Sequence, residues 1–538
     1  MNATVQEFRP AAEFGRQLED LQWIDGFVDR IRPYVRVRLE DGVLIKVPTE
    51  VYKLNASGLR LLHCALAGEG IAEVAAGVGA TGYPERLSQI HAFFCDVRDL
   101  LSGELGAGQG RRATAVKRFT GSFTAYPVLS ELAVTYRCNL SCVFCYAGCG
   151  TAGACSGNPG REKRRWRWPG RRGRAPREQE MTADEVLRVI DEIAGPGRVP
   201  SISFTGGEAT LRPELPSFIA RARDRGLRVN LITNGVRCAS EPYVRELEAA
   251  GLNSAQVSVE GPNAAIHDRI VRREGAFDRT RRGVENLQAA GITVHTHTTI
   301  SRDNADHLAG IIDLAAELGL PRVSMNMVIP TGTPNLPQHA ALRMRYDEIG
   351  EPVLLAREHA RERGVAFLWY SPTPFCLFNP IARGLGHKGC AACDGLLHVS
   401  PTGEVLPCSS FATGVGNLLE LGFDAVWFGK DAEYYRSKRM APLVCRTCDD
   451  FALCQGACTL YWSGMGKKEL YKAWLGKTLG LSGASQPGLR SRPTGCPRPP
   501  LAAVLPGLSC SDIAPRSAGS GDPAAVPGAD PGGTEVQP

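Results

Sequence analysis

The sequence predicts an α/β protein: a partial (β/α)6 barrel, preceded by a small winged-helix-like domain and followed by a cysteine-rich domain. Three observations support this architecture. Short apolar segments alternate with helical segments between about residues 127 and 347, a pattern typical of a parallel sheet covered by helices. A hairpin pattern precedes them, and most of the 18 cysteines fall into two clusters. A chain of 538 residues is too long for one compact core, so several domains are expected.

The first domain is expected over residues 27–103. Apolar residues alternate with charged ones in 35–39, and a mainly apolar run follows in 43–47, with an Asp41-Gly42 pair between them. That dipeptide between two such runs is typical of a β-hairpin. Helical periodicity follows in 56–67, 71–77 and 83–101. A hairpin with three helices predicts a fold that resembles a winged helix.

The second domain is expected over residues 127–347. Its strand candidates are 132–136, 202–204, 229–233, 256–259, 294–300 and 323–328. Its helix candidates are 183–193, 214–225, 241–250, 277–290 and 305–318. Units with this spacing either close into a barrel-like wall or wind into an open sheet. Both arrangements put the functional site at the carboxyl ends of the strands.

Two segments depart from this pattern. Residues 148–180 are rich in glycine, proline and arginine, and we expect a disordered surface insertion there. Contact with RNA is the alternative, because Trp166 and Trp168 stand among the arginines, but runs of charge are usually solvated loops. Residues 464–538 become rich in Gly, Pro, Ser and Ala, which predicts a largely disordered tail.

The overall charge and hydropathy exclude some functions. A net charge of +6 is small for this length and does not indicate a nucleic-acid partner. No apolar run is long enough to span a bilayer, and residues 1–20 lack the pattern of a signal peptide. We therefore expect a cytoplasmic protein with no membrane partner, in which clustered cysteines are reduced and bind metal.

Cys138, Cys142 and Cys145 form a CxxxCxxC motif directly after the first strand of the second domain. A four-iron cluster held by four cysteines is coordinatively full, whereas three cysteines leave one iron open to a substrate or cofactor. A structural zinc site prefers CxxC pairs and four closed ligands, and Cys149 is available as a fourth. The triplet favours iron–sulfur chemistry over zinc.

Residues 138–145, CNLSCVFC, resemble the signature of the radical S-adenosylmethionine (SAM) superfamily, and similar motifs follow the later strands in the family's order. The resemblance implies a [4Fe–4S] cluster on the three cysteines, with SAM on its open iron. In the family, the Gly-Gly-Glu segment holds the methionyl amino group of SAM. The cofactor-binding residues that the resemblance implies are Phe144, Tyr146, Gly206, Gly207, Glu208, Asn234, Ser258 and Glu260.

The family's mechanism is reductive cleavage of SAM to a 5′-deoxyadenosyl radical, which abstracts a hydrogen atom from the substrate. The protein positions the reactants and excludes water. The resemblance also implies a low-potential electron donor such as flavodoxin or ferredoxin. Two features depart from the family pattern: Ala209 stands where proline is common, and the arginine-rich insertion is unusual. No histidine or carboxylate stands out by its spacing as a catalytic acid or base.

A second cysteine pattern lies within residues 370–462. The sequence CxxCx₅CxxxC is formed by Cys445, Cys448, Cys454 and Cys458. Upstream, Cys393 precedes a Gx₄C pattern that ends at Cys408. This combination resembles the SPASM domain, a C-terminal extension that binds auxiliary [4Fe–4S] clusters. A structural zinc ribbon is the alternative.

The SPASM resemblance implies ligands for one or two auxiliary clusters. The first cluster would be held by Cys390, Cys393, Cys408 and Cys458, with Cys376 as a candidate to replace one of the first two. The second would be held by Cys445, Cys448 and Cys454. Its fourth ligand would be a later cysteine, either Cys496 or Cys510.

Residues 51–58, VYKLNASG, follow the hairpin of the first domain. They resemble the PqqD-like RiPP recognition element, a family that binds leader peptides of ribosomally made precursors. A peptide that adds as a strand to the hairpin edge is a physically reasonable binding mode. The alternative is a winged-helix module that binds DNA or only packs.

Together these patterns predict a radical SAM/SPASM enzyme that modifies a ribosomally synthesised precursor peptide. Alternatives within the class are maturation of an enzyme's active-site residue and modification of a small molecule. An RNA-modifying enzyme would need the insertion at Arg161–Arg177 to bind RNA, with a strong dependence on salt. An alternative of another class is a non-enzymatic, cysteine-rich metal-binding regulator, against which the SAM-binding motifs argue.

Overall fold

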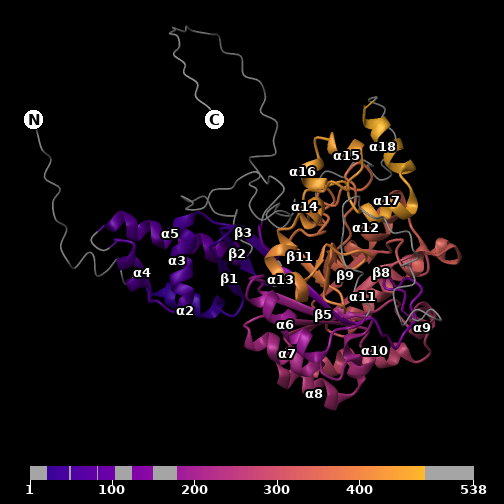
Figure 1. The fold of residues 1–538 in the computed structure, drawn as a ribbon, viewed down its shortest axis with the longest axis horizontal. Coiled ribbons are helices and arrows are strands. Elements are labelled where there is room, and N and C mark those ends of the chain that lie inside the picture. The colour runs from indigo at the N-terminus through magenta and orange to yellow at the C-terminus, as the bar shows by residue number, and fades with distance from the viewer. Residues whose placement is uncertain (1–20, 48–49, 81–82, 103–123, 150–178, 479–538) are drawn as a thin grey trace, which may run out of the picture.

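In the computed structural model, the described residues are 21–47, 50–80, 83–102, 124–149 and 179–478 (Figure 1). Most of the predicted insertion 148–180 and of the tail 464–538 therefore lies outside the described residues. No helix in the described ranges is long and apolar enough to cross a membrane.

The N-terminal unit confirms the predicted hairpin and three helices and adds a first helix and a third strand. Its elements are α2 (Trp23–Ile31), β1 (Val35–Arg38), β2 (Val43–Lys46), β3 (Glu50–Lys53), α3 (Ala56–Ala67), α4 (Ile71–Gly77) and α5 (Pro84–Ser102). The strands form an antiparallel sheet in the order β1-β2-β3. The β1–β2 turn uses Gly42 at a φ of 70°. The side chain of Asn55 caps α3 by accepting the Gly58 amide at 2.7 Å.

The six predicted strands of the second domain are all present, each within three residues of its predicted bounds. They are β4 (Leu129–Thr135), β5 (Ser201–Gly206), β6 (Arg228–Thr233), β7 (Ser254–Ser258), β8 (Thr293–Ile300) and β9 (Arg322–Met327). The predicted helices are α6 (Ala183–Ala194), α7 (Leu215–Asp224), α8 (Glu241–Ala250), α10 (Ala276–Ala289) and α11 (Leu308–Glu317).

The strands β4 to β9 are parallel and lie side by side in chain order. Because strand-to-strand crossovers are right-handed, an order without reversal places all the connecting helices on one face. The two end strands of the sheet, β10 and β13, do not pair with each other in the described residues, so the wall stays open. This confirms the predicted partial barrel.

The sheet continues beyond the predicted six strands. Among the described residues it has ten strands, in the order β10-β9-β8-β7-β6-β5-β4-β11-β12-β13. The additional strands are β10 (Ala366–Trp369), β11 (Leu396–Val399), β12 (Glu404–Leu406) and β13 (Gly416–Asn417). β11 pairs in parallel with β4, so the cysteine-rich region is joined to the barrel by backbone hydrogen bonds.

The remaining α-helices follow β7, β9 and the strands of the C-terminal region. They are α9 (Ala264–Val271), α12 (Tyr346–Glu362), α13 (Leu418–Trp427), α14 (Lys430–Arg436), α15 (Leu443–Arg446), α16 (Phe451–Cys454), α17 (Thr459–Met465) and α18 (Lys468–Thr478). Helix α18 lies within the first part of the predicted tail 464–538, and residues 479–538 lie outside the described residues. This helix is held by Leu470, which is buried, and by Glu469, which accepts from the Tyr461 hydroxyl.

Candidate functional site

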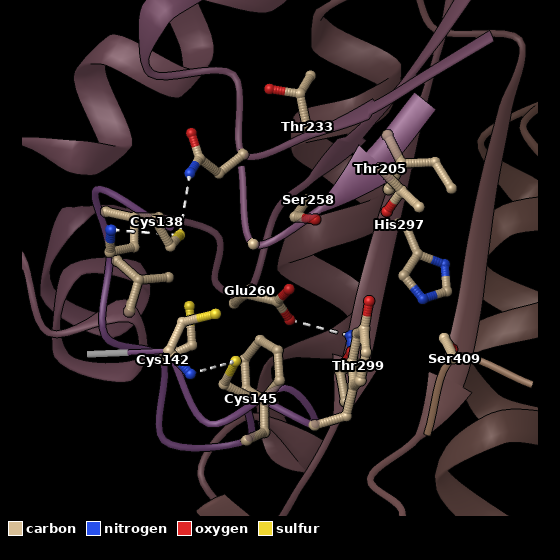
Figure 2. A pocket seen from close by; sticks show the side chains of 18 of the residues that line it. Cys138, Cys142, Cys145, Thr205, Thr233, Ser258, Glu260, His297, Thr299 and Ser409 are labelled. Carbon is tan, nitrogen blue, oxygen red and sulfur yellow. Dashed lines mark hydrogen bonds between the residues drawn. The ribbon is translucent and has the colours of Figure 1, made fainter. Parts of the chain in front are cut away.

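A pocket opens at the carboxyl ends of the parallel strands (Figure 2). The thiols of Cys138, Cys142 and Cys145 lie on one side of it, and Ser258 and Glu260 lie between them and His297. Seven of the eight predicted cofactor-binding residues line this pocket: Phe144, Tyr146, Gly206, Gly207, Asn234, Ser258 and Glu260. The structure therefore brings the sequence motifs of four strands together at one edge.

The three cysteines lie on the loop after β4, and neighbouring backbone holds this loop in place. The Ser141 amide donates to the Val271 carbonyl at 3.1 Å, and the Val143 amide donates to the Ile270 carbonyl at 3.0 Å. Both acceptors belong to the last turn of α9, where carbonyls lack partners within the helix. The loop is thus fixed before any cofactor binds.

Gly206 and Gly207 bring the Gly-Gly-Glu segment against the start of the cysteine loop. The Gly207 amide donates to the Thr135 carbonyl at 2.8 Å, and the Glu208 amide donates to the Arg137 carbonyl at 2.9 Å. A Cβ on Gly206 would overlap the carbonyl oxygen of Thr135, and one on Gly207 would overlap that of Arg137. Only glycine permits this close approach.

Glu208 does not line the pocket, and its carboxylate is hydrogen-bonded to other residues of the chain. It accepts hydrogen bonds from the Thr210 hydroxyl at 2.7 Å, the Thr233 hydroxyl at 2.8 Å and the Asn234 amide at 2.8 Å. Burial raises the pKa of Glu208, while these donors act in the opposite direction. The residue ties the end of β5 to the end of β6, and its direct contact with SAM stays a prediction.

The environment of the three thiols fits an iron–sulfur cluster. Burial, with a smaller contribution from the carboxylate of Glu208, raises the pKa of Cys138 to about 12. Burial, with the neighbouring Cys145 and Cys138, raises the pKa of Cys142 well above its usual value. Three thiolates in one buried site repel one another, so a positive iron core is needed to keep all of them deprotonated.

Cys145, one of these three cysteines, also interacts with Cys149. The pKa of Cys145 is lowered to about 7, chiefly by a hydrogen bond from the Cys149 thiol. The Cys149 amide also donates to the Cys145 sulfur at 3.3 Å. The Cys149 thiol lies 3.0 Å from the Tyr136 carbonyl as well. Hydrogen bonds from Cys149 therefore stabilise the thiolate form of Cys145.

Among the described residues, no three Cys, His, Asp or Glu side chains are grouped as a single metal ion requires. A four-iron cluster holds its ligands on separate irons, and this is the kind of cluster that the CxxxCxxC motif predicts.

Glu260 and His267, which also line the pocket, carry buried polar atoms suited to a polar ligand. The Glu260 amide donates to Nδ1 of His267 at 3.2 Å, which assigns the ring proton to Nε2. That buried Nε2 has no hydrogen-bond partner among the described residues. The Glu260 carboxylate accepts from the Thr299 amide at 2.9 Å, and burial raises the pKa of Glu260 to about 8. A cofactor such as SAM offers partners for such groups.

The sequence interpretation missed several residues that line the pocket: Glu131, Gln256, His297, Thr299, Asn326, Ser409 and Ser410. His297 on β8 bonds Ser324 Oγ at 2.9 Å and stacks on Tyr370, and burial lowers its pKa to about 4. A usable signal existed in β8, a strand inside the sheet that is polar at nearly every position. Because side chains of a strand point to alternate faces, every second one of these polar side chains faces the lumen of a barrel.

The four cysteines predicted for the first auxiliary cluster lie together. Burial, with Cys458 and Cys390, raises the pKa of Cys408 well above its usual value. Burial and Cys390 likewise raise the pKa of Cys458 to about 12. The amide of Cys393 donates to the Pro407 carbonyl at 3.0 Å, which sets Cys393 beside Cys408.

The three cysteines predicted for the second cluster also lie together, and both candidates for its fourth ligand lie outside the described residues. Burial, with Cys454 and Cys448, raises the pKa of Cys445 to about 12. Cys496 and Cys510 lie outside the described residues. Cys376, predicted as a replacement in the first group, lies beside this second group instead, next to Cys454.

Comparison with family models identifies two of the three regions. Residues 132–315 match the Radical SAM superfamily. Residues 390–449 match SPASM, an iron–sulfur cluster-binding domain. The first match covers the barrel strands and the cysteine loop, and the second contains the Gx₄C pattern and the CxxC pair that begins at Cys445.

Similar proteins include enzymes with two kinds of product. An AdoMet-dependent heme synthase of Methanosarcina barkeri is 27% identical over 361 residues, which is 62% of this chain and 92% of the relative. A PqqA peptide cyclase of Ruegeria pomeroyi is 29% identical over 341 residues, which is 62% of this chain and 82% of the relative. The crystal structure of Streptococcus suis SuiB bound to precursor peptide SuiA shares the fold, with a TM-score of 0.56 and 14% identity over 79% of this chain and 94% of that chain.

Proposed function

We propose that this chain, a radical SAM enzyme with a SPASM domain, modifies a ribosomally synthesised precursor peptide whose leader binds to the N-terminal unit. When bound, a reduced [4Fe–4S] cluster on Cys138, Cys142 and Cys145 and SAM supply hydrogen-atom abstraction from the substrate. A low-potential electron donor such as flavodoxin or ferredoxin would deliver the electron. The auxiliary clusters of the SPASM domain would exchange electrons with the substrate.

The residues of the chain position the reactants and shield them. The cysteine loop and the glycines after β5 hold the cluster side of the pocket rigid. The buried polar groups of Glu260 and His267 line the same pocket as the thiols and orient the cofactor. The lumen beyond them, around Glu131 and His297, is left for the reacting part of the substrate. Burial of these walls keeps water from the reacting atoms.

The observation that carries the peptide proposal is the outer edge of β3. The Leu54 amide donates to the Gly42 carbonyl, and in the β2–β3 register these two residues are opposite each other. Alternate residues of an antiparallel pair bond the partner strand. Tyr52 therefore faces β2, whereas the backbone groups of Val51 and Lys53 point outward. No strand in the described part of the chain pairs with this edge, so a peptide can add to it as a fourth strand.

Arg38 fixes the N-terminal unit to the barrel. Its guanidinium donates to the carbonyls of Pro127 at 2.8 Å and Tyr126 at 3.1 Å, just before β4. It also forms a buried ion pair with Asp41 at 2.8 Å, and Asp41 accepts the Ala125 amide at 2.9 Å. Because these contacts join β1 to the strand that leads into the cysteine loop, a peptide on the N-terminal unit would be held at a defined place relative to the barrel.

The relatives support a peptide substrate in two ways. One curated relative is a peptide cyclase, and the SuiB structure contains a precursor peptide. The SuiB likeness covers 79% of this chain, more than residues 124–478 can supply alone, so it extends beyond the barrel and SPASM region. The N-terminal unit is the other described part of the chain.

A substitution in β3 tests the leader site. Val51→Pro removes an outward N–H without removing a β2–β3 hydrogen bond, and proline is tolerated on an edge strand. Val51→Ala keeps the amide and is the matched control. The ligands are short peptides encoded beside the gene, labelled and titrated into the full chain by fluorescence anisotropy. We expect Val51→Pro to weaken binding at least tenfold and Val51→Ala to leave it nearly unchanged. Equal binding by both variants would contradict the proposal.

The second candidate is a small-molecule enzyme, which the heme synthase relatives favour at similar identity. It predicts that a haem precursor, and no peptide, increases 5′-deoxyadenosine formation by the reconstituted enzyme. Under the peptide proposal, a haem precursor has no effect and a cognate peptide changes mass. Mass spectrometry of both mixtures separates the two functions.

A further inference from the structure

The second auxiliary group has three cysteines from the SPASM pattern, Cys445, Cys448 and Cys454, and a four-iron cluster held only by protein needs a fourth ligand. The SPASM pattern supplies that ligand from a cysteine further along the chain. Among the described residues, an additional thiol near this group comes from earlier in the chain. It is Cys376, which lies 69 residues before Cys445, in the segment that follows β10.

Backbone contacts place Cys376 at this group. The amide of Phe375, the residue before it, donates to the sulfur of Cys454 at 3.4 Å. The amides of Leu377 and Phe378, the residues after it, both donate to the Pro374 carbonyl at 2.9 Å. Phe378 is buried and packs on Gly350 of α12. Cys376 therefore sits on a tight turn that is anchored on both sides.

The electrostatic neighbours of Cys376 are the same three cysteines. Burial raises the pKa of Cys376 to about 12, and Cys454, Cys445 and Cys448 contribute to the rise. Thiols that perturb one another in this way must lie close, because the interaction decreases with distance.

The two auxiliary groups have different neighbours. Besides burial, the pKa of Cys408 is raised by Cys458 and Cys390, which belong to the first group. The segment between Cys376 and Cys390 also packs against the second group, since a ring nitrogen of His387 bonds the Leu453 carbonyl at 2.7 Å. Cys376 therefore lies beside the second group, and Cys390, further along the chain, lies in the first group.

We propose that Cys376 is the fourth ligand of the second auxiliary cluster, which is therefore complete without Cys496 or Cys510. With four thiolates the cluster has no open iron, so it transfers electrons and does not bind the substrate. This inference rests on the SPASM domain and is independent of the peptide proposal.

Iron content tests the inference without any substrate. The background is the full chain with Cys138→Ala, Cys142→Ala and Cys145→Ala, which removes the SAM-binding cluster. After anaerobic reconstitution, this protein should hold about eight irons in two clusters. Adding Cys376→Ala should lower the content to about four, or to about seven with the EPR signal of a three-iron cluster in oxidised samples. Adding Cys496→Ala and Cys510→Ala together should leave about eight.

Two controls separate ligation from folding. Cys64→Ala changes a cysteine of the N-terminal unit and should retain all the iron. Cys376→Ser offers an oxygen ligand and should recover most of the iron with an altered reduction potential, which a folding defect would not produce. The inference is overturned if Cys376→Ala keeps about eight irons with an unchanged EPR spectrum, or if the Cys496/Cys510 variant loses a cluster.

Discussion

At the scale of single residues, the site depends on glycines as much as on cysteines. Gly207 lies so close to the Arg137 carbonyl that a methyl group there has no space. Such an overlap with backbone must displace the cysteine loop, because a main-chain atom cannot rotate away. Any residue at this position would therefore alter the geometry of the thiols before it affected SAM.

The first prediction follows from this contact. Gly207→Ala should lower reconstituted iron by about four atoms per chain, because the SAM-binding cluster no longer forms. Gly77→Ala is the control, since a Cβ at Gly77 would meet no atom within 4 Å. Iron and sulfide analysis with EPR checks the result. A Gly207→Ala protein with the full iron content and normal SAM cleavage would show that the contact is not critical.

A second prediction concerns His297, whose burial lowers its pKa to about 4. An unfolded histidine titrates near 6.5, so between these pH values the unfolded chain binds a proton that the folded chain does not. The free energy of unfolding should therefore fall as the pH drops, by about 2 kcal/mol between pH 7 and 5. His297→Gln should remove this part of the pH dependence.

Urea unfolding of the cluster-free chain at both pH values measures the effect. His63→Gln, on the exposed side of α3, should retain the dependence of the wild type. If the His297→Gln chain loses as much stability on acidification as the wild type, His297 is not the responsible group.

The sequence predicted the pocket residues that belong to motifs, and it missed those that do not. The cysteines and strand-end glycines have recognisable spacing, so their convergence followed from a parallel sheet. Glu131, Gln256 and Asn326 have no such pattern, because each is one polar residue on a separate strand. Cys376 was a candidate for the first group, whereas the structure places it beside Cys454 of the second, because only tertiary structure decides which cysteines meet.

At the scale of elements, the long periodic segments were predictable and the short ones were not. The six barrel strands and their helices have strong apolar patterns, because both faces of a parallel sheet are buried. In contrast, β12 has three residues and β13 has two, and helices α15 and α16 have four each. Such short elements are determined by cysteine positions and neighbouring contacts and carry little periodicity.

The third prediction belongs to the contact between two elements, β1 and the start of β4. Arg38→Ala should leave the Asp41 carboxylate buried without its partner, at a cost of about 3–5 kcal/mol. We expect the N-terminal unit to detach and to unfold in a separate, earlier calorimetric transition. Arg36→Ala is the control, because Arg36 on β1 donates only to nearby backbone carbonyls. A single transition like that of the wild type would contradict this role.

At the scale of the whole molecule, one sheet unites the barrel with the SPASM region. β11 pairs with β4, and across this pair the buried His398 bonds Glu131 at 3.1 Å. The sequence suggested separate domains with a boundary near residue 370, because the cysteine pattern begins there. The sheet spans that boundary, because β4, which precedes the SAM-binding loop, pairs with β11 from the cysteine-rich region.

The fourth prediction follows from this shared sheet. Truncation after residue 369 would expose one side of β4 and remove the partner of Glu131. An apolar strand that becomes the exposed edge of a sheet is prone to aggregate. We expect the truncated chain to be insoluble even when iron and sulfide are supplied. Soluble expression with a cooperative unfolding transition would show that the barrel folds without the SPASM region.

The measurement that tests the central claim most directly is deuterium transfer. The reconstituted enzyme is incubated anaerobically with dithionite, SAM and a deuterated peptide encoded beside its gene, and 5′-deoxyadenosine is analysed by mass spectrometry. We predict deuterium in 5′-deoxyadenosine, a matching mass change in the peptide, and neither in the variant that lacks Cys138, Cys142 and Cys145. The peptide function would be contradicted if 5′-deoxyadenosine stays unlabelled and the peptides stay unchanged. The same holds if label is transferred only from a deuterated haem precursor.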